Sequence, residues 1–237
     1  MNIVLLSDDE VDDHGGATLE GRRFNHLSRV LKVVPNQEIR VGIIDSGRGT
    51  AIVSEINDHH VRLQIDIREP PLPAHPIIPI IALPRPKMLR RILRQCAEFG
   101  VEEIHLINSY RVEKSFWQTP LLRPEKIRSA LLEGLERSGA TKLPRVHLHQ
   151  RFRPFVEDEF GALRGSKHAW IAHPSSALTL PTDITEPSLI CIGPEGGFIP
   201  FEVELLATQG AQAAHLGTRI LSVDTAVTCV LGRTLVG

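Results

Sequence analysis

The segment LICIGPEGGF (residues 189–198) joins a short apolar run to a turn that is rich in glycine. The apolar run is typical of a buried strand. Gly193, Gly196 and Gly197 allow the backbone to turn sharply and to approach a ligand closely. The segment lacks the GK[ST] ending of a P-loop and the GxGxxG pattern of dinucleotide sites. Taken alone, it is either a structural turn after a core strand or one wall of a ligand site.

Short apolar strands and amphipathic helices alternate around this segment. We expect strands over residues 103–107, 169–172, 189–193 and 213–217. Helices are predicted from an apolar stripe over residues 89–97, from first-turn prolines at 124 and 200, and after the segment 222–224. Such alternation indicates an α/β domain with a largely parallel sheet.

The first part of the chain has a different predicted secondary structure, which is mostly short strands. Strands are expected over residues 3–6, 39–45, 49–56 and 61–67, which suggests a small barrel-like module. One helix is predicted among them, because Phe24, Leu27, Val30 and Leu31 follow a helical spacing. Four prolines in the segment EPPLPAHP (69–76) indicate a stiff linker. The predicted boundaries are therefore a first domain over 1–70, a linker over 71–76 and a second domain over 77–237.

The composition and the cysteine spacing argue against several classes of protein. The chain has 237 residues, a net charge of −1 and 3 widely spaced cysteines, so neither a disulfide framework nor a zinc site is indicated. We expect no metal, because the two His-rich stretches at 58–60 and 147–149 lack matching ligand spacing. No apolar run is long enough for a membrane span, and the acidic start is unlike a signal peptide. A reduced, cytoplasmic protein is predicted.

Three loops follow three of the predicted strands: AHPSSA (172–177), IGPEGGF (192–198) and LGTRILSVDTAV (216–227). Ligands collect at the carboxyl ends of strands in open parallel sheets, so the three loops are expected to line one crevice.

The same loops carry a family signature. IGPEGGF followed by LGTRIL and a [DE]TA triplet resembles the C-terminal signature of SPOUT-class RNA methyltransferases, and within that class the RsmE family. HLSRVLKVVPNQEIRV resembles the PUA-like β-barrel of that family, and RRILRQCAEFGVEEIHLI resembles the entry to its catalytic domain. The resemblance covers the whole chain. It implies a trefoil-knotted α/β catalytic domain behind a PUA-like RNA-binding barrel, and a homodimer that uses S-adenosylmethionine to methylate N3 of a uridine in small-subunit ribosomal RNA.

Carried over position by position, the resemblance implies a set of site residues. The expected cofactor-binding residues are His173, Ile192, Gly193, Gly196, Gly197, Leu216, Gly217, Ile220 and Leu221. Because the methyl donor is already activated, the protein mainly aligns donor and acceptor, and a base must also accept the N3 proton. Glu195 is the candidate that orients the uracil or receives this proton, or else it only caps backbone N–H groups. Arg219 is the candidate that holds a phosphate or stabilises charge on the uracil oxygens.

Two basic clusters suggest a partner that carries phosphate groups, namely ribosomal RNA or the small ribosomal subunit. One such cluster alone is usually a solvated helix face, but two in a nearly neutral chain favour RNA. The predicted RNA contacts are Arg22, Arg23, Arg29, Lys32, Arg85, Lys87, Arg90 and Arg91.

The chain also departs from the family pattern. Ser222 and Asp224 replace an arginine and a glutamate, and Ala140 and Thr141 stand near an expected arginine. Arg111, Lys114 or Lys142 would then compensate for the missing cation. Two alternatives therefore stay open: a SPOUT paralogue that acts on another RNA or on a ribose hydroxyl, and an RNA-binding or ribosome-assembly factor without catalysis.

Overall fold

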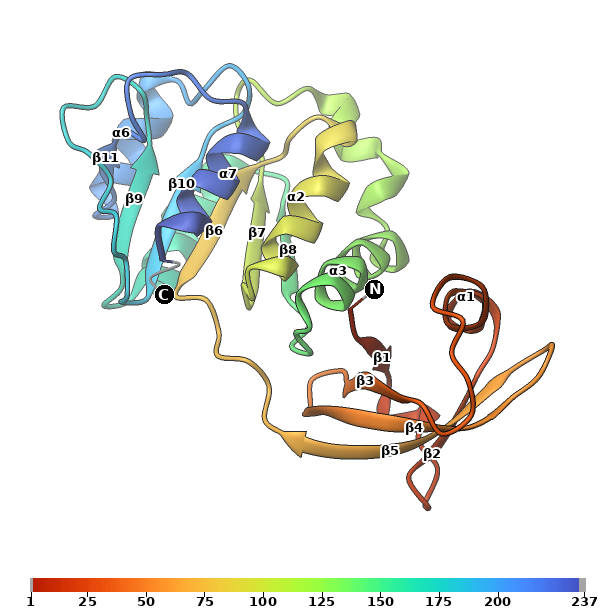
Figure 1. Cartoon of the computed structure of the whole chain (residues 1–237). Coiled ribbons are helices and arrows are strands. Elements are labelled where there is room, and N and C mark those ends of the chain that lie inside the picture. Colours follow the sequence, from red (N-terminus) through yellow and green to blue (C-terminus); the bar gives the residue numbers. More distant parts are fainter. Residues whose placement is uncertain (1, 235–237) are drawn as a thin grey trace. The chain divides into compact units, whose positions relative to one another are not determined.

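The computed structural model describes residues 2–234, and the chain divides into two compact units (Figure 1). The first unit holds the chain up to Pro73 together with Leu132–Leu143. The second holds Ala74–Leu131 and the chain from Pro144 onward. The domain boundaries expected from the sequence stay a prediction.

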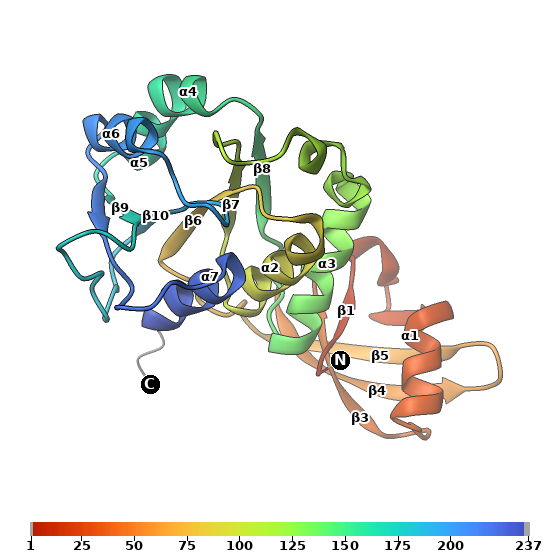
Figure 2. The same cartoon turned by 90° about the horizontal axis from the view of Figure 1, so that it is seen from above.

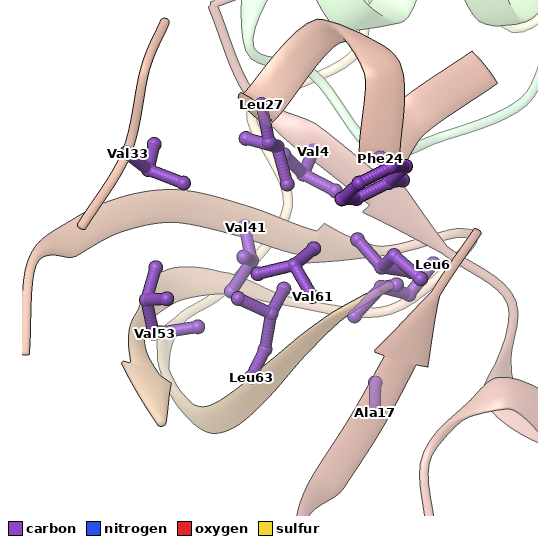
Figure 3. Packing of buried hydrophobic residues seen from close by; sticks show 12 residues of the cluster. Val4, Leu6, Ala17, Phe24, Leu27, Val33, Val41, Val53, Val61 and Leu63 are labelled. Atoms are coloured by element: carbon purple, nitrogen blue, oxygen red, sulfur yellow. The ribbon is translucent and has the colours of Figure 1, made fainter. Parts of the chain in front are cut away.

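The first unit is a curled five-stranded sheet. Its strands are β1 (Val4–Leu6), β2 (Gly16–Leu19), β3 (Glu38–Ile43), β4 (Arg48–Ile56) and β5 (Val61–Glu69), in the spatial order β1-β3-β4-β5-β2. β1 is parallel to β3, and the other pairs are antiparallel. Apolar side chains of alternating strand positions meet Phe24 and Leu27 in one buried core, shown in Figure 3.

The predicted helix of this unit is partly wrong. It consists of α1 (Gly21–Asn25) and a π-helical turn over His26–Val30. Phe24 and Leu27 are buried as expected, but Val30 and Leu31 are 66% and 48% exposed. A π-helical turn holds more residues than an α-helical turn, so the apolar stripe rotates towards solvent after Leu27.

The second unit is built on a six-stranded sheet whose pairs are all parallel. Its strands are β6 (Ile77–Ala82), β7 (Glu103–Ile107), β8 (Arg145–His149), β9 (His168–Ala172), β10 (Ser188–Ile192) and β11 (Gln212–Ala214). The spatial order is β11-β9-β10-β6-β7-β8. The predicted parallel α/β arrangement is confirmed.

Helices cover both faces of this parallel sheet. α2 (Pro86–Glu98) and α7 (Val223–Leu231) lie on one face, where α7 packs against α2 and β10. α4 (Phe152–Pro154), α5 (Gly161–Arg164) and α6 (Pro200–Thr208) lie on the other face, as Figure 2 shows. α3 (Pro124–Ser138) begins at the predicted proline. Among residues 2–234, none of the helices has the length and the apolar character that a membrane span requires.

Three strands were not expected from the sequence: β2, β6 and β8. β6 is central, although Pro79 cannot donate a ladder hydrogen bond. Pro79 is in register with Ile190 of β10, and pairing with β7 begins one residue later, at Ile80. The chain between β5 and β6 has no helix or strand, as the prolines of the predicted linker require.

Candidate functional site

One cavity of about 240 Å³ opens at the carboxyl ends of β9, β10 and β11. The loops that follow these three strands line it together with Val223 and Ala226 of α7. The prediction that the three loops share one crevice is thus confirmed. All candidate cofactor-binding and catalytic residues line the cavity: His173, Ile192, Gly193, Gly196, Gly197, Leu216, Gly217, Ile220, Leu221, Glu195 and Arg219. Their individual roles stay predictions.

Glycine is required in the loop after β10 for steric reasons. A Cβ atom on Gly193 would lie 2.9 Å from the backbone nitrogen of Phe198, closer than real Cβ atoms come. The N–H of Gly197 donates to the Pro194 carbonyl (2.8 Å), which closes a turn around Glu195 and Gly196. Gly197 then has a φ of +73°, which side chains with a Cβ rarely adopt. The backbone itself therefore forms this wall of the cavity.

The carboxylate of Glu195 is held by the neighbouring loop. Its Oε1 accepts a hydrogen bond from the backbone N–H of Arg85 (3.3 Å) and lies 3.7 Å from the Nε of that arginine. The Glu195 side chain is still 32% exposed. Glu195 thus contacts the loop after β6, at the start of α2, and also lines the cavity.

The loop over residues 216–222 forms another wall. It carries Arg219, which is exposed, and Ile220, which is 88% exposed. Gly217 has a φ of +138°, and its N–H donates to the His215 ring (3.1 Å). This hydrogen bond fixes the beginning of the loop, while Arg219 and Ile220 at its centre stay exposed to solvent.

Ser222 and Asp224, two of the four expected departures from the family pattern, lie where this loop enters α7. The hydroxyl of Ser222 donates to Asp224 Oδ1 (2.7 Å), and Arg91 of α2 donates to Asp224 Oδ2 (3.1 Å). The Ser222 hydrogen bond and, to a smaller extent, the Arg91 guanidinium hold the pKa of Asp224 below its usual range. Asp224 therefore stays charged and links α7 to α2.

A buried carboxylate that sequence reasoning missed joins the loop after β7 to α6. Glu202 is 2% exposed and accepts hydrogen bonds from the Tyr110 N–H (2.7 Å), the Ser109 hydroxyl (3.2 Å) and the Ile199 N–H (3.0 Å). Its place three residues after the N-cap Ile199 is the spacing of a capping glutamate, which was the available signal. In the same loop, Arg111 donates to the Gly196 carbonyl of the cavity wall.

Several of the predicted RNA contacts are held by ion pairs. Some arginines are held by carboxylates: Arg22 pairs with Glu136, Arg23 with Glu10, Arg85 with Glu195 and Arg91 with Asp224. The hydrogen bond from Arg23 lowers the pKa of Glu10 to about 2. Exposed side chains occur both among these paired arginines, namely Arg22, Arg85 and Arg91, and at Arg29, Lys32, Lys87 and Arg90.

Histidines and cysteines form no metal centre within residues 2–234. The rings of His105 and His147 are stacked with their centres 4.6 Å apart, and His105 Nδ1 lies 3.0 Å from His149 Nε2. Cys96 and Cys191 are fully buried, and burial raises the pKa of the Cys96 thiol to about 12.

The two units resemble known domains. Residues 70–235 match the family described as RNA methyltransferase domain, and residues 19–66 match the RNA methyltransferase PUA domain. The chain is also 34% identical over 236 residues to ribosomal RNA small subunit methyltransferase E of Treponema pallidum, with 95% of this chain and 87% of that protein covered. This chain belongs to the RsmE family of RNA methyltransferases.

Two other RsmE proteins are similar to this chain. The enzyme of Synechocystis is 27% identical over 233 residues, which span 91% of this chain and 71% of that protein. The crystal structure of the Neisseria gonorrhoeae enzyme bound to S-adenosylmethionine has the same fold, with a TM-score of 0.75 and 23% identity over 98% of this chain and 95% of that chain. The predicted SPOUT-type α/β fold with a PUA-like first domain is therefore confirmed.

Proposed function

We propose that this RsmE-family chain transfers a methyl group from S-adenosylmethionine to N3 of a uridine in small-subunit ribosomal RNA. Family membership supports methyl transfer to ribosomal RNA. The observation that carries the proposal is the cavity at the carboxyl ends of β9, β10 and β11, because the loops with the family signature line it together.

The residues of the cavity fit the proposed cofactor. Gly193 leaves open a space that a Cβ could fill only by pushing against the backbone of Phe198. Backbone groups of Gly193, Gly197 and Gly217 would hold the polar edges of the adenine and the ribose. The apolar side chains around them would cover the ring faces: Ile192, Leu216, Ile220 and Leu221. His173 would close the cavity from the loop after β9.

When bound, S-adenosylmethionine supplies a methyl group on a positively charged sulfur, so no further activation of the donor is needed. The chain must then align the uracil and remove the N3 proton. Glu195 is held by Arg85 at the cavity rim, and we propose that it accepts this proton or orients the uracil edge. Arg219 lines the same cavity and would stabilise negative charge on the uracil oxygens.

RNA would be held by the PUA-like domain and by basic residues near the cavity. The exposed side chains of Arg29 and Lys32 in the first unit, and of Lys87 and Arg90 on α2, are the proposed phosphate contacts. The homodimer and the trefoil knot stay predictions from the family resemblance, and the cytoplasmic location stays a prediction from the composition. Light scattering of the purified protein tests the first of these.

The deciding experiment maps modified nucleosides in ribosomal RNA from a strain that lacks this gene, before and after incubation with the purified protein and S-adenosylmethionine. Loss of N3-methyluridine in the strain and its return on incubation is the expected result. Persistence of N3-methyluridine in the strain contradicts the proposed base. A missing ribose methyl group would favour the paralogue, and no binding of S-adenosylmethionine in calorimetry would favour a non-catalytic factor.

Glu195→Gln separates the two roles of the carboxylate. If Glu195 accepts the proton, the variant binds cofactor and RNA normally but loses most of its turnover. A variant that keeps full turnover shows that the carboxylate only orients the loop or the uracil.

A further inference from the structure

The short loop after β7 is fixed next to the cavity by three of its residues. Ser109 and Tyr110 donate to the buried carboxylate of Glu202 on α6, at 3.2 and 2.7 Å. Arg111 donates to the carbonyl of Gly196, which lines the cavity. A Cβ on Gly196 would lie only 2.8 Å from the Arg111 side chain, so glycine allows this close approach. The loop is therefore held against both the cavity wall and the helix that follows it.

The side chain of Tyr110 projects into solvent from this fixed backbone. It is 80% exposed, and Tyr110 is the single tyrosine of the chain. The next aromatic residues along the chain differ: Phe116 and Trp117 are half-buried, and the Trp117 indole donates to Asn108 (2.9 Å). Tyr110 thus offers a free ring face that these two residues do not.

The surroundings of Tyr110 suit a polyanion that carries bases. Arg111 follows it directly, and Lys114, three residues after Arg111, is exposed. Over residues 108–118 the single acidic residue is Glu113. Aromatic rings next to cationic side chains are how proteins hold single-stranded RNA, because every base has a face that can stack.

We propose that Tyr110 stacks on a base of the RNA at the rim of the cavity, and that Glu202 is the residue that positions it. The proposal deepens the proposed function and rests on RNA being the substrate. The buried carboxylate fixes the Tyr110 backbone before RNA arrives, so that little backbone freedom is lost on binding. Arg111 is placed to contact the adjoining phosphate.

The single tyrosine allows a direct test of stacking. In the full chain labelled at its tyrosine ring, the one ring signal is recorded by NMR while a short oligouridine, and separately naked small-subunit ribosomal RNA, is added. Stacking predicts an upfield shift of this signal with both RNAs. The absence of any shift with both RNAs overturns the proposal. A signal that moves with protein concentration before RNA is added also overturns it, because Tyr110 would then contact a second copy of the chain.

Two variants of Tyr110 test whether its ring contributes to the affinity for RNA. Tyr110→Ala is expected to weaken RNA binding about tenfold and to raise KM for RNA, while Tyr110→Phe binds like the unaltered chain. Binding of S-adenosylmethionine is expected to stay unchanged in both. Unchanged RNA affinity in Tyr110→Ala contradicts the proposal, even if methylation itself proceeds. If the protein fails to methylate RNA but its tyrosine signal still shifts, the proposed methyltransferase function is refuted and the stacking proposal is not.

The positioning role of Glu202 is tested in the absence of RNA. Glu202→Gln removes the charge that three donors share, so the Tyr110 ring signal of the free protein is expected to broaden or split. Glu204→Gln, an exposed position on the same helix, is the control and should leave the signal unchanged. If Glu202→Gln unfolds the protein, Ser109→Ala removes one of the donors and should broaden the signal to a smaller extent. A sharp, unmoved signal in the folded Glu202→Gln variant, or in Ser109→Ala where that variant must replace it, refutes the positioning role.

Discussion

Arg91 of α2 donates a hydrogen bond to Asp224 of α7 (3.1 Å), although the two residues lie 133 positions apart in the sequence. Asp224 is 8% exposed, whereas the side chain of Arg91 is 57% exposed. Asp224 lies in the first turn of α7, and Val223 and Ala226 of the same helix line the cavity. The ion pair therefore fixes one wall of the cavity to α2.

Arg91→Gln is expected to lower the free energy of unfolding by about 1 kcal/mol, because a nearly buried carboxylate loses its cation. A double-mutant cycle with Asp224→Asn should give a coupling energy of roughly 0.5 kcal/mol in urea unfolding. Affinity for S-adenosylmethionine should also fall a few-fold. Arg153→Gln, which removes an ion pair to Glu157 away from the cavity lining, is the control for affinity. Strict additivity in the cycle would contradict this account.

Glycines of the loop after β10 should differ in how well they accept alanine. Gly193→Ala places a methyl group 2.9 Å from a backbone nitrogen, which cannot move without distorting the turn. We expect it to reduce affinity for S-adenosylmethionine by more than about tenfold, equivalent to ~1.4 kcal/mol. Gly232→Ala is the control, since a Cβ there meets no atom within 4 Å. Calorimetry with the cofactor measures both.

Gly196→Ala is expected to be milder, because its methyl group meets the flexible side chain of Arg111 rather than backbone. Adding Arg111→Ala to Gly196→Ala should restore cofactor affinity, since the obstructing atoms are gone. If the double variant binds no better than Gly196→Ala alone, the steric explanation is wrong.

The cavity could be predicted from the sequence because its signal is local. Glycines after an apolar strand indicate a backbone that turns sharply or approaches another group closely. The carboxyl ends of parallel strands lie at one edge of a sheet. The contacts that hold the cavity together could not be predicted in this way. Glu195 meets Arg85 across 110 positions, and Glu202 meets Tyr110 across 92, so neither pair leaves a periodic signal.

One helix was partly mispredicted and the central strand β6 was missed, because the local sequence pattern does not match the structure that forms there. The π-helical turn at His26–Val30 rotates Val30 and Leu31 to the surface, although their spacing matches an α-helix. The central strand β6 was not predicted because it contains Pro79, and a proline in an apolar run argues against a strand within a hydrogen-bonded sheet. In both cases tertiary packing decides the conformation, and the local sequence carries the opposite signal.

Gly42 and Thr141 pack tightly within the first unit. A Cβ on Gly42 would lie 2.5 Å from Thr141 Cγ2 and 3.0 Å from the end of Ile3. Gly42→Ala should therefore lower the free energy of unfolding by about 2 kcal/mol through overpacking. Thr141→Ser removes the methyl group but keeps the hydroxyl that donates to the Ser46 carbonyl (2.8 Å). Combined with Gly42→Ala, it should recover at least half of the lost stability in urea unfolding, and no recovery would refute the clash.

The histidine stack of the second unit predicts how stability depends on pH. Burial, with the neighbouring His147 and His149 as further causes, lowers the pKa of His105 to about 3. Burial also lowers the pKa of His149, although Glu159 lies 3.4 Å from that ring. Glu103 faces His147 at 3.4 Å and is itself paired with Arg145.

Because His105 is neutral in the folded protein and ionises near pH 6.5 when unfolded, the unfolded state binds more protons between about pH 6.5 and 3. Stability should therefore fall as pH falls from 7 to 5.5, by at most ~1.4 kcal/mol per pH unit from this one group. His105→Asn cannot take up the proton and should flatten the slope, measured by urea unfolding at several pH values. His168→Asn, on the exposed side of β9, controls for the loss of an imidazole. An unchanged slope in His105→Asn would mean that other groups cause the pH dependence.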